Sequence, residues 1–131
     1  MNFFYIREKL LHKIRRKNAH HIHSPFIFDL YNQIIKPQRN NPKKLKEGFE
    51  NFFSEKGITY INCTYNEFII EKEKNKDEEK IICIKEPYKS KENNKELKKI
   101  LENSLSFVSI DLFYFVFIIK DKRLSAQKYI L

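Results

Sequence analysis

Apolar residues recur three to four positions apart near the start of the chain, a spacing that predicts a helix over residues 2–17. Lysine and arginine cover most of its remaining surface, so the helix is amphipathic and basic. Phe4 and Leu11 flank the apolar face. The face itself is made by Phe3, Ile6, Leu10 and Ile14.

Two further helices are expected before the composition changes. Ser24 is placed to cap the second, with Pro25 at its first position, where a missing N–H costs nothing. Pro37 is expected to end it. A polar connector then passes into a third helix over residues 42–56, which Gly57 terminates. Its inward side chains are Leu45, Phe49, Phe52 and Phe53.

The second part of the chain has shorter apolar runs of strand length. Residues 58–63 and 80–84 predict strands, the latter of the continuously apolar kind found in buried parallel sheets. Residues 66–72 fit a short strand or a helix equally well. A helix over residues 90–103 follows, and three strands are expected to finish the chain, at 105–110, 113–120 and 127–131.

This order predicts an α/β fold in which N-terminal helices pack on a small mixed sheet of about four or five strands. An antiparallel hairpin is expected near its end. The helical segment 1–56 and the sheet region 57–131 are expected to form one compact domain, because 131 residues is an ordinary single-domain length.

The charge balance narrows the classes of partner. Lys and Arg number 26 against 17 Asp and Glu, giving a formal net charge of +9 that favours polyanions such as RNA, DNA or an anionic membrane surface. Ordinary solvated lysine-rich faces would give the same balance. No apolar run approaches the ~20 residues of a membrane span, and Cys63 and Cys83 have no metal-ligand spacing. We expect a cytoplasmic protein.

Glycine is too scarce for a phosphate-binding loop. Such loops need several glycines between a strand and a helix, where the backbone takes positive φ and approaches the ligand closely. The chain has two glycines, Gly48 and Gly57, and neither follows a predicted strand. The sequence therefore predicts no nucleotide or S-adenosylmethionine (SAM) loop, and no cofactor held by this chain alone.

Candidate catalytic and metal-binding residues are few. The cluster His20, His21 and His23 reads either as metal ligands or, more simply, as helix caps and solvated rings, and we expect no metal. Glu86 and Asp111 follow predicted strands, but nothing in the sequence brings them together. Both cysteines lie in apolar strands, where a thiol is usually a buried hydrophobe with a raised pKa.

A basic run at the end of the first helix is the main candidate polyanion site, because its side chains could neutralise phosphates from one side. Tyr5 and Tyr31 could add base stacking. The alternative is an ordinary charged surface stripe. The run comprises Lys13, Arg15, Arg16, Lys17, His20 and His21.

Two segments together resemble a known family. The HxxHSPF core (His20, His23, Ser24, Pro25 and Phe26) is similar to the N-terminal segment of a family of class I SAM-dependent methyltransferases found in Bacteroidota. The C-terminal stretch 88–131, which contains VSIDLF and Asp111, looks like that family's last helix and final three strands. The resemblance covers about half of this chain.

The resemblance implies a truncated relative that lacks the cofactor-binding half. A class I methyltransferase sheet runs 3-2-1-4-5-7-6, so residues 58–63 and 80–84 would be its fourth and fifth strands. Relatives carry acidic residues at the end of this fifth strand, where they face the active site. In this chain Glu86 alone keeps that charge. The fourth strand would be left as a sheet edge, which must be covered by helices or paired with another chain.

The leading hypothesis is therefore a non-catalytic, methyltransferase-like remnant that binds a protein partner or RNA, with a homo-oligomer through the sheet edge as one form of partner. One alternative is a methyltransferase subunit whose SAM site is completed by a second chain. The other is a basic RNA-binding module with no true methyltransferase relationship.

Overall fold

The computed structural model describes residues 3–16, 22, 24–72, 79–102, 107–121, 123–124 and 126–131. Most boundaries lie within a few residues of the sequence prediction. In chain order the elements are α1 (Phe3–Arg15), α2 (Pro25–Leu30), the π-helical turn η2 (Tyr31–Ile35), α3 (Lys36–Gln38), α4 (Pro42–Glu55), β1 (Thr59–Cys63), α5 (Tyr65–Glu71), β2 (Lys80–Lys85), α6 (Lys91–Glu102), β3 (Val108–Asp111), β4 (Phe115–Lys120) and β5 (Gln127–Ile130).

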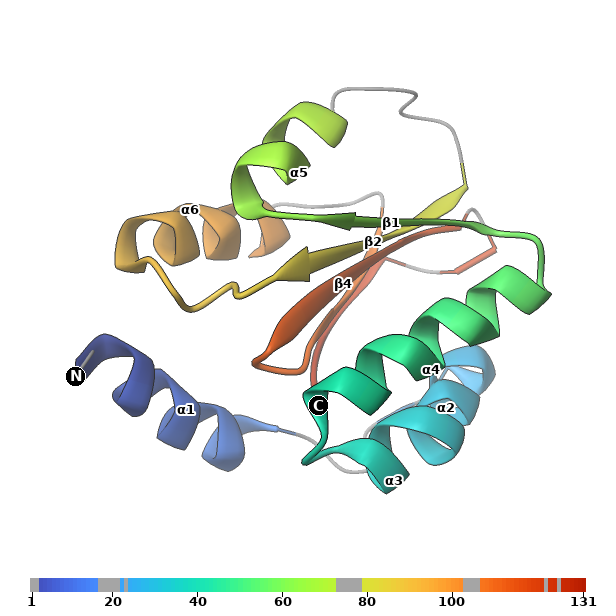
Figure 1. The fold of residues 1–131 in the computed structure, drawn as a ribbon, viewed down its shortest axis with the longest axis horizontal. Helices are drawn as coiled ribbons and strands as arrows, with labels where there is room; N and C mark the ends of the chain where they lie inside the picture. Colours follow the sequence, from blue (N-terminus) through green and yellow to red (C-terminus); the bar gives the residue numbers. More distant parts are fainter. Residues whose placement is uncertain are drawn as a thin grey trace.

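The helices lie on both faces of one sheet, which confirms the predicted α/β architecture (Figure 1). Helices α2 to α4 cover one face, and α5 and α6 cover the other. Helix α1 stands apart from both groups. Within the described residues, no helix is long and apolar enough to cross a membrane.

The sheet has the order β1-β2-β4-β3-β5. Strand β2 runs parallel to β1, β4 is antiparallel to both β2 and β3, and β5 is parallel to β3. The hairpin expected near the end of the chain is therefore β3–β4. Strand β4 is thus the one reversed strand of the described sheet, and β1 and β5 form its two edges.

Strand β2 is buried from both sides, as its continuous apolar run predicted. Ile81 and Cys83 belong to the core under α2 to α4, whereas Ile82 and Ile84 belong to the core under α5 and α6. This alternation is the two-residue period of a strand.

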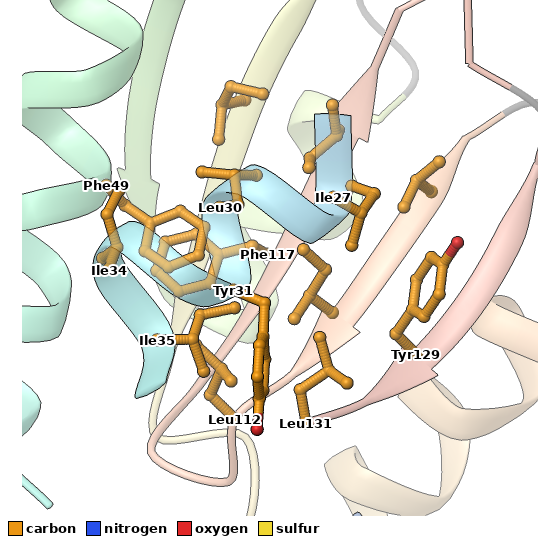
Figure 2. Packing of buried hydrophobic residues seen from close by; sticks show 14 of the residues in the cluster. Ile27, Leu30, Tyr31, Ile34, Ile35, Phe49, Leu112, Phe117, Tyr129 and Leu131 are labelled. Atoms are coloured by element: carbon orange, nitrogen blue, oxygen red, sulfur yellow. The ribbon is translucent and has the colours of Figure 1, made fainter. Parts of the chain in front are cut away.

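The larger core is held by helix side chains that cover the middle of the sheet (Figure 2). Phe49 of α4 stacks on Phe117 of β4 with ring centroids 3.9 Å apart, and both rings are fully buried. Burial of an apolar side chain of this size stabilises the fold by roughly 1.5–3 kcal/mol. Gly48 lets α4 approach η2 closely, because a Cβ there would lie 2.8 Å from Ile34 Cγ2.

Local signals explain most helix ends. The Ser24 hydroxyl accepts a hydrogen bond from the Ile27 N–H, as an N-cap should, and Gly57 follows α4 with φ of +72°. The expected stop at Pro37 is wrong. Helical structure continues to Gln38, because the wide turn η2 places Pro37 in the first turn of α3, where its missing N–H is tolerated.

Residues 66–72, which fitted a strand or a helix, lie almost entirely in helix α5. Thr64 accepts a hydrogen bond from the Glu67 N–H, while the Glu67 carboxylate accepts one from the Thr64 N–H. This reciprocal capping box favours the helix.

Candidate functional site

Strands β1, β2, β3 and β5 run in the same direction, so their carboxyl ends lie at the same side of the sheet, where ligands of open α/β sheets usually bind. Strand β2 ends before Glu86, and β3 ends at Asp111. The tight connection through Phe113 and Tyr114 leads from β3 back into β4. Helix α1 packs against this end of the molecule through His12 and Tyr5.

The carboxylate of Asp111 is the centre of a buried polar cluster. Only 7% of Asp111 is exposed. One carboxylate oxygen accepts the hydroxyl hydrogen of Tyr88, and the other accepts the Phe113 N–H at 2.8 Å. Burial, and then the nearby Asp111 charge and hydrogen bond, raise the pKa of Tyr88, so its hydroxyl keeps its proton and remains a donor.

Helix α1 is joined to this cluster by His12. Its Nε2 lies 2.9 Å from the backbone oxygen of Asp111, so this nitrogen carries the hydrogen and donates it. The same nitrogen is 3.6 Å from the Asp111 carboxylate. One turn earlier, buried Glu8 lies 3.5 Å from Lys98 of α6. Tyr5 adds an edge contact to Phe113, with centroids 5.0 Å apart.

These contacts turn the polar side of α1 toward the protein. Glu8 and His12 are buried, whereas the apolar residues Phe3, Leu10 and Ile14 are 85%, 58% and 79% exposed. An amphipathic surface helix normally buries its apolar face. The predicted apolar stripe of α1 is real, but it faces outward.

An aromatic cleft of about 530 Å³ opens at the carboxyl end of β2, beside the β3–β4 connection. The rings of Tyr5, Tyr114 and Phe115 are half-buried there, so part of their surface is available for contact. Among the described residues that line it, Glu86 alone is acidic. The lining residues are Tyr5, Pro42, Lys85, Glu86, Tyr88, Lys89, Phe113, Tyr114 and Phe115.

A small basic recess of about 40 Å³ shares Phe113 and Tyr114 with this cleft. Its lining, as far as the chain is described, has four cations and no carboxylate: Lys9 and Lys13 of α1, Arg16 directly after it, and Arg39 from the turn before α4. Lys9 Nζ also lies 5.6 Å from the centre of the Tyr114 ring. Cations and aromatic rings therefore adjoin on one surface.

Glu86 lies between two clefts rather than in a catalytic pair. It lines the aromatic cleft and a second cleft of about 560 Å³ beside Thr64 and Asn93. Its backbone has φ of +49°, a left-handed conformation that costs a non-glycine residue energy. Its exposed carboxylate is 3.5 Å from Lys89. Strand β4 separates the strands that end at Glu86 and Asp111, so these carboxylates are not brought together.

The two thiols are positioned as core residues, as expected. Burial raises the pKa of Cys63 to about 12 and that of Cys83 to about 11, so both are protonated at neutral pH. Among the described residues, no group of three or more His, Cys, Asp or Glu side chains could hold a metal ion.

The predicted basic run is described only in part. Lys13 and Arg15 are exposed, and Arg16 is half-buried. Lys17, His20, His21 and His23 lie outside the described residues. Within the family motif, Ser24 is the helix cap, Pro25 is exposed and Phe26 packs on Phe53.

Tyr31 cannot stack on a base, contrary to the sequence interpretation. It is 4% exposed, and its hydroxyl accepts a hydrogen bond from Arg39. Sequence reasoning also missed Arg39, Tyr88 and Tyr114, which come from three separate segments. The sequence did carry a signal for the polar contacts of α1, because Glu8 and His12 are four residues apart and therefore share a helix face.

We expect the Tyr88→Phe substitution to lower the free energy of unfolding by about 1.5–3 kcal/mol, because it removes the hydroxyl that donates to one oxygen of the buried Asp111 carboxylate. Tyr129→Phe is the matched control, since that hydroxyl donates to the uncharged Gln127 side chain and should cost about 0.5–1.5 kcal/mol. Denaturant unfolding measures both. Equal losses would contradict a special role for the Tyr88–Asp111 bond.

No protein-family model, curated protein or solved structure matches the chain. The aromatic cleft, the basic recess and the Asp111 cluster are therefore the observations from which its function is inferred.

Proposed function

We propose that this chain is a non-catalytic binding protein whose ligand is single-stranded RNA. The observation that carries the proposal is the aromatic cleft that adjoins the basic recess at the carboxyl end of the sheet. Unpaired bases stack on aromatic side chains, and lysine and arginine bind the phosphates between them. A net charge of +9 favours the approach of such a polyanion.

The arrangement suits RNA with exposed bases better than a duplex. Tyr5, Tyr114 and Phe115 offer ring surface that a base can reach only when it is not stacked in a helix. The recess is small and lined by cations, which suits a single phosphate group better than a whole nucleotide. A base in the cleft and a neighbouring phosphate at Lys13 and Arg16 would satisfy both features.

We further propose that the fold derives from the distal half of a class I methyltransferase. The strand order β1-β2-β4-β3 with β4 reversed supports this relationship, as do the family-like segments around Ser24 and Asp111. The outer edge of β1 is where the first strand of a complete methyltransferase sheet would pair. No described strand pairs with that edge here.

The β1 edge also favours a second candidate function, a methyltransferase subunit whose SAM site is completed by a partner chain. An open edge offers backbone donors and acceptors to another strand. Glu86, at the adjacent strand end, would then face the completed site.

RNA binding can be tested by fluorescence anisotropy with a labelled single-stranded oligonucleotide. Lys13→Ala/Arg16→Ala should weaken binding and reduce the slope of log K against log salt by about 1.4, from ~0.7 per lost phosphate contact. Lys95→Ala/Lys99→Ala removes the same charge from exposed positions on α6 and should have little effect. Tyr114→Leu should cost about 1–3 kcal/mol of binding.

If Lys95→Ala/Lys99→Ala weakened RNA binding as much as Lys13→Ala/Arg16→Ala, total charge alone would decide the affinity. That result would contradict a localised site. Tighter binding of duplex than of single-stranded RNA would contradict base stacking in the cleft.

Isothermal titration with SAM and with S-adenosylhomocysteine distinguishes the proposed function from the subunit alternative. We expect no binding to the isolated chain, because neither glycine, Gly48 in α4 or Gly57 after it, forms a cofactor loop after a strand. Micromolar binding by the chain alone would contradict this account. SAM binding that requires a co-purified partner and is lost in Glu86→Lys would support the subunit alternative.

A further inference from the structure

The outward face of α1 is an apolar stripe, defined here as Phe3, Ile6, Leu10 and Ile14. These side chains are 85%, 39%, 58% and 79% exposed. Their spacing of three and four residues places them along one side of the helix. Exposed apolar residues scattered singly are ordinary on proteins, but four in one row mark an interaction surface.

Among the residues of α1, basic side chains border this stripe and acidic side chains do not. Arg7 follows Ile6 on one side and Lys13 precedes Ile14 on the other, and both are exposed. Glu8 is the only acidic residue of α1. It is buried on the opposite side of the helix, close to Arg7 and Lys98. The solvent side of α1 is therefore apolar and cationic only.

The charges beside the apolar stripe indicate which kind of partner binds it. A second copy of the chain would place the Arg7 and Lys13 side chains of two α1 helices beside each other, and these like charges repel. The surface of an anionic bilayer provides both requirements at once: lipid headgroups for the cations and the acyl boundary for the apolar stripe. Apolar residues bordered by lysine and arginine are typical of helices that lie in the membrane interface.

We propose that α1 binds the surface of membranes that contain anionic lipids, lying in the plane of the interface with its apolar stripe inserted. The Glu8 and His12 contacts hold the opposite side of the helix on the protein, so the stripe is presented without unfolding. This function goes beyond RNA binding: the apolar stripe lies on a different side of α1 from the basic recess, and Lys13 borders both surfaces.

Flotation with lipid vesicles tests the proposal, with phosphatidylcholine alone compared with phosphatidylcholine mixed with phosphatidylserine. We expect binding to the mixed vesicles only, and a loss on the order of tenfold or more in Leu10→Gln/Ile14→Gln. Ile70→Gln is the matched control, because Ile70 is 62% exposed on α5, outside the stripe, and should leave binding unchanged.

A second measurement reports insertion directly. The chain has no tryptophan, so Phe3→Trp introduces a single reporter at the most exposed residue of the stripe. Its emission should shift to shorter wavelength with anionic vesicles and stay unchanged with neutral ones. Circular dichroism of each variant verifies that the fold is retained.

Absence of binding to the anionic vesicles would overturn the proposal, as would equal binding by Leu10→Gln/Ile14→Gln and Ile70→Gln. Self-association that is lost in Leu10→Gln/Ile14→Gln, without vesicle binding, would assign the stripe to a second copy instead. RNA affinity measured on the same variants separates the two proposals. We expect Leu10→Gln/Ile14→Gln to bind RNA normally.

Discussion

The buried carboxylate of Asp111 sets the arrangement of this end of the molecule. A carboxylate removed from water is stable only when hydrogen bonds replace its hydration. Tyr88 and the Phe113 N–H provide them, and the His12 ring lies beside the same residue. The tight connection after β3, the segment after β2 and helix α1 are thereby brought together around one side chain.

This constraint explains both proposed surfaces. Because α1 uses its polar side to reach Asp111, Lys9 and Arg16 are placed beside the β3–β4 connection, where they form the basic recess with Arg39. The same orientation leaves Leu10 in solvent on the other side of the helix. One buried polar cluster thus produces a cationic and aromatic surface on one side of α1 and an apolar stripe on the other.

The α/β fold was largely predictable because its signals are local. The continuous apolar run at 80–84 predicted a buried parallel strand, and Gly57 marked the end of α4. The site was not predictable, because Tyr88 and Asp111 meet only through tertiary packing. The orientation of α1 was missed for a related reason: its apolar stripe suggested a buried face, and nothing local shows that His12 has a buried partner 99 residues away.

Hydrogen exchange of the α1 amides tests this orientation most directly, because the two faces of the helix can be altered separately. His12→Ala should reduce the protection of α1 strongly while β2 and β4 keep theirs, since it removes the contact with Asp111. Leu10→Ala should leave protection of α1 nearly unchanged, because Leu10 is 58% exposed. The reverse result, with Leu10→Ala releasing the helix and His12→Ala leaving it protected, would contradict the account.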